Sequence, residues 1–436
     1  MTMKRCIFCL LLFWTIPTAS AQETMRIEDA VRIGLRSNYD IQVARNTKTI
    51  SQRSIGLGRA DFLPTVNFSN NFQLNRSDQS TNSPFAFGNS NTRSFGSQVS
   101  LNWTVFDGFR MFNNTDRYEK LSRLGAIQTK VALERTVVEI FVAYFNLVRQ
   151  EQLLDVLHNA RNVSNARLQK EQVRNDLGGT SSTDIFNAQV AYNNDRANVL
   201  DQELTVVIAK QQLNILLGRD PETEVVVARE ITVPVQELSY QEILERTLKQ
   251  NNRLLVARQN TSVSEESVRL SRSSLYPVVT LNSSYGYANR RVSAPQFDLP
   301  ITTRSRDGGI GITVSYNIFN GKRDRISLQN ARAEAYNTEL IQRNTELEIR
   351  GLVQEKYVTL QKRLELIDLE AQNVQTAEQN LALQQEKYAL GASTSIEFRD
   401  AQVNLIRAQA TLINARFQAR IAHTEIRQLI GAIPLD

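Results

Sequence analysis

The amino-acid sequence predicts an α+β fold, in which long coiled-coil helical hairpins form a helical barrel and four strands per chain contribute to a transmembrane β-barrel. Three observations predict this fold. The 436 residues contain an internal duplication with a constant offset of 213 positions. Each half has two stretches of about ten residues in which apolar and small polar side chains alternate. Each half also has more than sixty consecutive residues with no proline and one glycine.

The duplication is visible at landmark residues along the whole chain. A proline, a short triplet and a Leu-Gly pair recur in both halves without slippage in their spacing. One pair of long repeats differs from the period of about 20–50 residues found in solenoids and propellers, so we expect two copies of one unit in a pseudo-twofold arrangement. The matching positions are Pro64 and Pro277, Phe106-Asp107-Gly108 and Phe319-Asn320-Gly321, Leu177-Gly178 and Leu390-Gly391, and Ala188-Gln189-Val190 and Ala401-Gln402-Val403.

The N-terminal segment and the duplication set the expected boundaries of the chain. Residues 1–21 have the features of a secretory signal peptide, since Lys4 and Arg5 precede an apolar stretch that ends in small residues. That stretch is too short to span a bilayer as a helix, and a retained anchor is the alternative. We expect the first repeat at 22–218, a mixed linker at 219–239 and the second repeat at 240–436.

Each repeat is expected to open with a helix, at about 27–60 in the first repeat, and a proline ends that helix because it cannot donate a backbone hydrogen bond. Two strands with period-two alternation follow in each repeat. Their length and their single apolar face are typical of membrane barrel strands, although an edge of a soluble sandwich alternates too. The four strands are expected at about 65–75, 94–106, 278–288 and 309–319.

Two helices of unusual length follow the strands, at 110–176 and 322–389. At 1.5 Å per residue each is about 100 Å long, which requires support from neighbouring helices. Val137, Phe141 and Tyr144 are spaced by four and three residues, as in a coiled-coil seam. Each long helix ends at a Leu-Gly turn, because glycine readily adopts the left-handed conformation after a helix. Returning helices are expected at 183–217 and 395–430.

Composition excludes several classes of function. Both cysteines lie in the signal segment, so the processed chain has no disulfide, thiolate metal site or cysteine nucleophile. His158 and His423 stand alone on predicted helices, where packed or solvated histidines are the simplest interpretation. The net charge of +6 falls by two with the loss of Lys4 and Arg5, and no basic run indicates nucleic-acid binding. No catalytic motif, metal site or cofactor is predicted.

Four membrane strands cannot close a barrel, because single-chain barrels begin at eight strands and open sheet edges are not tolerated in lipid. The chain is therefore expected to oligomerise. Three copies would supply twelve strands, enough for an aqueous channel, and twelve long helices that extend the channel as a tube.

On these residues the chain resembles the TolC family of outer-membrane efflux and secretion channels. The duplicated order of helix, proline, two strands and helix carries the resemblance, together with the triplets at 106–108 and 319–321 and the Leu-Gly tips. The resemblance implies a homotrimer in the outer-membrane lipid that extends into the periplasm, with an equatorial belt that includes 219–239. It also implies a passive exit duct for efflux or type I secretion, docked to a periplasmic adaptor (membrane fusion protein) and an inner-membrane pump of the RND or ABC type.

The resemblance also assigns roles to residues of the two tips. Two acids that ring the closed pore in the family fall on Glu397 and Asp400, and a first-repeat acid falls on Asp184. The usual arginine partner of that first-repeat acid is Ser393 here, and Arg399 or Lys387 are the candidate substitutes. The adaptor-docking turns are Gly178, Gly179, Thr180 and Ser181 in the first repeat and Gly391, Ala392, Ser393 and Thr394 in the second.

Two alternatives to these assignments stay open. Glu397 and Asp184 can serve simply as acids at a helix N-terminus, where negative charge is favourable. At the level of the whole chain, the alternative to a duct is an exported coiled-coil scaffold or periplasmic adaptor without a pore. An enzyme is the least supported class, because no phosphate loop or catalytic set is present.

Overall fold

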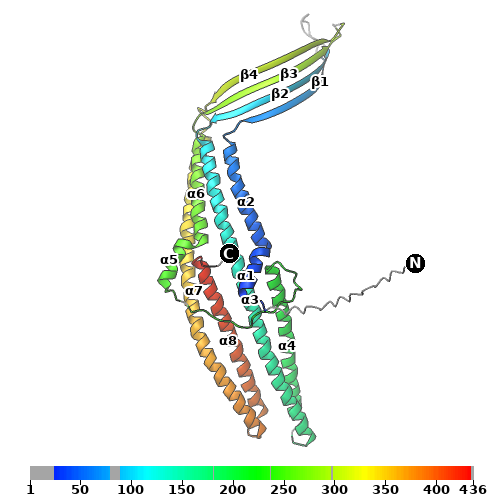
Figure 1. Ribbon diagram of the computed structural model, residues 1–436, viewed down its shortest axis with the longest axis vertical. Coiled ribbons are helices and arrows are strands. Elements are labelled where there is room, and N and C mark those ends of the chain that lie inside the picture. The colour runs from blue at the N-terminus through cyan, green and yellow to red at the C-terminus, as the bar shows by residue number, and fades with distance from the viewer. Residues whose placement is uncertain (1–23, 79–88, 180, 236, 296–297, 434–436) are drawn as a thin grey trace, which may run out of the picture.

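The computed structural model describes the chain except for residues 1–23, 79–88, 180, 236, 296–297 and 434–436. The expected signal peptide at 1–21 lies outside the described residues. The molecule is long, with a four-stranded sheet at one end and a narrow layer of helices extending from it (Figure 1). None of the described helices is both long enough and apolar enough to cross a membrane.

The two repeats have the same order of elements. The first contains α1 (Ile27–Ser37), α2 (Tyr39–Ala60), β1 (Thr65–Ser77), β2 (Ser90–Phe106), α3 (Arg110–Asp176) and α4 (Ser182–Leu216). The second contains α5 (Tyr240–Gln250), α6 (Asn252–Ser273), β3 (Val278–Ser293), β4 (Ile301–Ser315), α7 (Arg323–Ala389) and α8 (Ser395–Leu429).

Two expected elements differ from the structure. The helix expected at 27–60 is broken at Asn38, which is extended and caps α2 by accepting a hydrogen bond from the Ile41 amide at 3.1 Å. The strand expected at 309–319 lies instead at Ile301–Ser315. Its partner β3 begins at Val278, directly after a proline, so residues beyond Ser315 have no strand to pair with. Residues 301–308 lack an apolar alternation that would have revealed them.

The four strands form one antiparallel sheet in the order β1-β2-β3-β4, so the two repeats meet at β2 and β3. The register aligns Trp103 with Leu281, and Leu281 with Ile312, on one side of the sheet. We call this side the apolar face. Among the described residues, the outer edges of β1 and β4 pair with no further strand.

The helices form a single layer in which α3 and α7 run the full length (Figure 1). The shorter helices lie end to end along them, α2 and α4 beside α3, and α6 and α8 beside α7. The same contact joins the shorter helices in each repeat where their ends meet. Asn38 Nδ2 donates to the Leu216 carbonyl at 2.8 Å, and Asn251 Nδ2 donates to the Leu429 carbonyl at 3.1 Å. The duplication therefore extends to individual hydrogen bonds.

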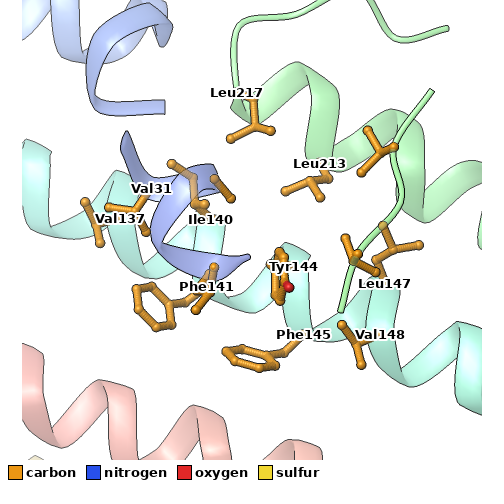
Figure 2. Close-up of a cluster of buried hydrophobic side chains, with 14 of the residues drawn as sticks. Val31, Val137, Ile140, Phe141, Tyr144, Phe145, Leu147, Val148, Leu213 and Leu217 are labelled. Atoms are coloured by element: carbon orange, nitrogen blue, oxygen red, sulfur yellow. The ribbon is translucent and has the colours of Figure 1, made fainter. Parts of the chain in front are cut away.

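The apolar core lies in the middle of the helical layer and has two parts. In the first, Val31 of α1, Ile140 and Tyr144 of α3, and Leu213 of α4 surround a common centre (Figure 2). The linker joins this cluster through buried valines at 225 and 227, and the Met25 amide donates to the Val226 carbonyl at 2.9 Å. The second part is the repeat counterpart, built from α5, α7 and α8.

His423 of α8 gives this region an expected sensitivity to acid. The side chain is 9% exposed, and burial together with Arg420 and Arg427 lowers the pKa of His423 to about 4. The unfolded chain binds this proton near pH 6.5, so stability is complete above that pH and falls as the pH drops toward 4. The expected loss is about 3 kcal/mol.

Thermal unfolding followed by circular dichroism between pH 7 and pH 4 measures this effect. In the His423→Gln variant, the unfolding midpoint is expected to fall less between pH 7 and pH 4, because glutamine binds no proton in that range. His158→Gln is the matched control, and it should keep the slope of the unaltered protein. Equal slopes for the two variants would contradict the assignment to His423.

Candidate functional site: the free ends of the helical hairpins

Both helical hairpins turn at the end of the molecule opposite the sheet (Figure 1). Gly178 and Gly391 adopt φ values of 73° and 75°, a left-handed conformation that disfavours other residues. The next amides close each turn: Gly179 donates to the Arg174 carbonyl at 2.7 Å, and Ala392 donates to the Lys387 carbonyl at 2.8 Å. Two matching turns are thus fixed by backbone hydrogen bonds. Thr180 lies outside the described residues.

The acids that follow the turns cap the returning helices. Ser181 Oγ accepts from the Asp184 amide at 3.3 Å and donates to the Asp184 carboxylate at 2.7 Å. In the second repeat, Thr394 Oγ1 accepts from the Glu397 amide at 3.2 Å, and the Glu397 carboxylate accepts from the Thr394 amide at 2.7 Å. The reciprocal bonds of Thr394 and Glu397 form a capping box, which stabilises the first turn of a helix.

Glu397 is an exposed carboxylate with several donors. Hydrogen bonds from the Thr394 backbone, the Ser393 hydroxyl and the Thr394 hydroxyl lower the pKa of Glu397 within one chain. The Ser393 hydroxyl lies 2.9 Å from Glu397 and 2.8 Å from Gln384, and donates its proton to one or the other. The capping role expected as an alternative from sequence is therefore present in the single chain.

Asp400 is exposed and lies one turn beyond Glu397 on the same helix face. Asp184 occupies the position of Glu397 in the first repeat, whereas Asn187 occupies that of Asp400. The pair of acids is therefore a feature of the second repeat.

Arg399, one candidate substitute for the arginine missing at Ser393, pairs with a different acid within the single chain. Its guanidinium binds Asp195 of α4 through two parallel contacts of 2.7 and 2.8 Å, and Asp195 is 2% exposed. Beside it, Gln402 Nε2 donates to the Ala160 carbonyl of α3 at 2.9 Å. These contacts join the second hairpin to both helices of the first.

A second cross-link lies closer to the turn. The Tyr388 hydroxyl donates to Glu171, which is fully buried, at 2.5 Å, and the Tyr388 ring stacks on Phe398 with centroids 5.6 Å apart. The Arg167 guanidinium lies over both rings. Burial and the bond to Glu171 raise the pKa of Tyr388. We call these contacts, with the Arg399–Asp195 pair, the hairpin junction.

Sequence reasoning missed the hairpin junction. Its partners are more than 200 positions apart, and neither a motif nor a periodicity joins them. The one signal available was the placement of Tyr388 and Phe398 on either side of the second turn. Among the described residues, no group of three or more His, Cys, Asp or Glu side chains is placed so that it could hold a metal ion.

Comparison with known proteins decides the family. Residues 32–219 and 243–432 match the family described as outer membrane efflux protein. The chain belongs to this family. The two matched segments correspond to the two repeats, as the duplication predicts.

Individual relatives agree with this assignment. The chain is 20% identical to the outer membrane protein TolC of Vibrio cholerae over 386 residues, which cover 86% of this chain and 83% of that protein. It is 23% identical to the pyoverdine export outer membrane protein OpmQ of Pseudomonas putida over 450 residues, covering 94% and 89%. The fold matches the crystal structure of VceC from Vibrio cholerae with a TM-score of 0.75 at 17% identity, covering 93% and 96%.

The family confirms the predicted fold class, the outer-membrane location with extension into the periplasm, and the function as an exit duct for efflux or type I secretion. It is a family of transport channels rather than of enzymes. Proteins of this kind work with adaptors and inner-membrane pumps.

Proposed function

We propose that three copies of this chain form a continuous duct whose tip docks a periplasmic adaptor and, through it, an inner-membrane pump. The edges of the single chain support a closed ring. Leu340, Leu347 and Leu369 belong to an exposed stripe on α7, and their spacings of 7 and 22 residues keep them on one helix face. On the other edge, exposed apolar residues lie on α2 at the level of Leu340 and Leu347, and on α4 toward the level of Leu369; they include Ile50 and Leu204.

The helices that carry these exposed residues, α7 on one side and α2 and α4 on the other, lie on opposite edges of the helical layer (Figure 1). Heterologous contact of one edge with the other closes a ring when the rotation allows it. The unpaired edges of β1 and β4 are complementary in the same way, because β1 of one copy can continue the sheet beside β4 of the next. Edge-to-edge contact between successive copies would therefore close both the strand barrel and the helical tube.

The turns at Gly178–Ser181 and Gly391–Thr394 are the proposed adaptor-docking sites. They are the most remote part of each hairpin from the sheet, and their residues are small and exposed or half-exposed where the structure describes them. An RND or an ABC pump is compatible with this surface, since specificity for cargo is expected to reside in the pump.

Glu397 and Asp400, with Asp184 of the first repeat, are the proposed pore constriction. In a ring of three copies the second-repeat acids would gather six carboxylates around one axis. Such a ring favours cations, and mutual repulsion raises carboxylate pKa values in opposition to the capping bonds of Glu397. The exposure of Glu397 and Asp400, on one helix face beside the turn, carries the proposal.

Single-channel recording in a planar bilayer tests this constriction. Glu397→Ala with Asp400→Ala is expected to reduce cation preference severalfold and to enlarge the conductance, because the fixed negative charge and its side chains are removed. Asp176→Ala with Glu386→Ala is a matched control, since both are exposed acids of the long helices near the turns. Unchanged selectivity in the first variant would remove these acids from the constriction.

A further inference from the structure

A row of arginines lies on the apolar face at the end of the sheet farthest from the helices. The register of the three strand pairs places one or two arginines of every strand on this face. All of them are exposed. We call this row the arginine belt; its members are Arg76 of β1, Arg93 of β2, Arg291 of β3, and Arg304 and Arg306 of β4.

The belt follows the apolar side chains directly on β1 and β2, and after one intervening residue of the face on β3 and β4, Asn289 and Gly308. On β1, Leu74 is the last apolar residue of the face, and Arg76 takes the next position on it. On β2, Phe95 and Arg93 have the same relation. From Val66 to Leu74 the apolar band measures about 27 Å along the strand, and a tilt of about 40° reduces this to about 21 Å. That height is close to the band of about 25 Å in membrane barrels.

The belt is also level with the edge of that band. Arg93 pairs with Leu74, so it lies two residues nearer the helices than Arg76 does. In the same way, Arg304 pairs with Asn289 and lies two residues nearer the helices than Arg291 does. The upper limit of the apolar side chains descends in the same direction from β1 to β4. Strands of a membrane barrel are tilted, so a line at constant depth crosses them with this kind of stagger. A barrel tilted in this sense would place the arginines at a similar depth, near the outer surface of the membrane.

The arginine belt brings like charges together without neutralising them. Arg93 and Arg291 are directly opposite each other across β2 and β3, an arrangement that is destabilising in an isolated sheet. Within the described part of the chain, no hydrogen bond or ion pair involves the side chain of a belt arginine. The other side of the sheet carries a single arginine at this end, Arg290, which lies between the neutral residues Ser94 and Thr303.

We propose that the arginine belt binds the phosphate groups of lipids in the outer leaflet of the outer membrane. Guanidinium groups bind phosphate through two parallel hydrogen bonds, and an anion between Arg93 and Arg291 would offset their repulsion. A lipid is favoured over free phosphate because the apolar band directly below the belt is where acyl chains would lie. This site is separate from the duct and from the tip, and it would fix the depth of the barrel in the membrane.

Binding of bisphosphorylated lipid A to the detergent-solubilised protein, measured by native mass spectrometry, tests the proposal. Arg291→Gln is expected to weaken binding about fivefold, which corresponds to about 1 kcal/mol for one arginine near an anionic surface. Arg93→Gln with Arg291→Gln should weaken binding about 25-fold. Arg290→Gln is the matched control, because Arg290 is the exposed neighbour on the opposite face, and its affinity should remain within about twofold of the unaltered protein.

Three results would overturn the proposal. One is equal affinity in the unaltered protein and the double variant. Another is equal binding of a lipid A preparation from which both phosphates have been removed. The third is complete displacement of lipid A by inorganic phosphate, which would indicate a site for free phosphate.

A salt titration keeps the proposal testable if the double variant does not assemble. Raising NaCl from about 0.1 M to about 0.5 M should weaken lipid A binding to the unaltered protein, because exposed charges are screened. Binding that does not depend on salt would contradict the belt. Channel currents report the duct separately, so a failed belt leaves that function intact.

Discussion

Arg399→Ala is expected to loosen the tip and to destabilise the helical hairpins. Asp195 would be left as a nearly buried carboxylate without its bidentate partner. Removing one member of a buried pair typically costs about 3–5 kcal/mol. The Arg399 side chain is 25% exposed, so water can partly replace it, and we expect the lower end of that range. The apparent unfolding midpoint should fall, and single-channel conductance should rise as the two hairpins separate.

Two variants isolate the ion pair as the cause. Arg407→Ala removes an exposed arginine from the same helix and should leave both measurements unchanged. Asp195→Asn removes the buried charge and retains a hydrogen-bond acceptor, so it should be milder than Arg399→Ala. If Arg399→Ala and Arg407→Ala behave alike, the hairpin junction does not hold the tip.

Leu347→Asp is expected to abolish assembly of the ring. Leu347 is 68% exposed in the single chain and lies in the centre of the α7 stripe. Contact with the opposite edge of the next copy would bury an unpaired carboxylate, which costs several kcal/mol at each of three identical interfaces. Light scattering coupled to size-exclusion chromatography should show that the trimer is lost.

Gln375→Asp is the matched control for this variant. It adds the same charge to an exposed position of α7, but about 100° around the helix from the stripe. This variant should remain trimeric. A Leu347→Asp protein that assembles as well as the control would exclude the α7 stripe from the interface.

The sequence predicted the main architecture because its signals are local and repeated. Alternation around Val66 and Val99, the absence of proline from 110–176, and glycine at 178 and 391 each follow from geometry within one element. The repeated triplets at 106–108 and 319–321 also have a local cause, since Gly108 and Gly321 adopt left-handed conformations between a strand and a helix. The duplication then reinforced each signal by presenting it twice.

Other features could not be predicted because they depend on distant partners. Asn38 interrupts a continuous helical pattern, and its junction with Leu216 forms only when α4 returns beside α3. The limits of β4 are set by where β3 begins. At the candidate site, the acids at Asp184 and Glu397 were found from their place after the turns, whereas the bond from Tyr388 to Glu171 required the packed hairpins.

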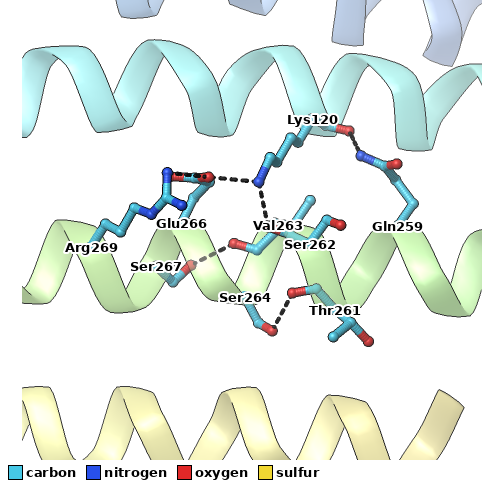
Figure 3. Close-up of polar contacts among 9 residues, drawn as sticks. All are labelled: Lys120, Gln259, Thr261, Ser262, Val263, Ser264, Glu266, Ser267 and Arg269. Carbon is cyan, nitrogen blue, oxygen red and sulfur yellow. Dashed lines mark hydrogen bonds and ion pairs between the residues drawn. The ribbon is translucent and has the colours of Figure 1, made fainter. Parts of the chain in front are cut away.

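The ion pair between Lys120 of α3 and Glu266 of α6 also forms only when distant helices pack together. Lys120 Nζ lies 2.6 Å from Glu266, which is 1% exposed, and Arg269 lies 3.2 Å from the same carboxylate (Figure 3). Gln259 adds a bond from its side chain to the Lys120 carbonyl at 3.0 Å. Neither helix shows a seam at these positions in the sequence, so only the structure reveals how the two repeats are joined below the sheet.

The position of the apolar core has a mechanical consequence. The first core cluster reaches Val148, and α3 continues without apolar clusters of comparable size for 28 residues to Asp176. That segment is an arm of about 42 Å. A rotation of about 5° at the core would displace the turn by about 4 Å, a distance comparable to the side-chain contacts that hold it. Small repacking near the middle of the molecule therefore suffices to widen its far end, while the sheet stays unchanged.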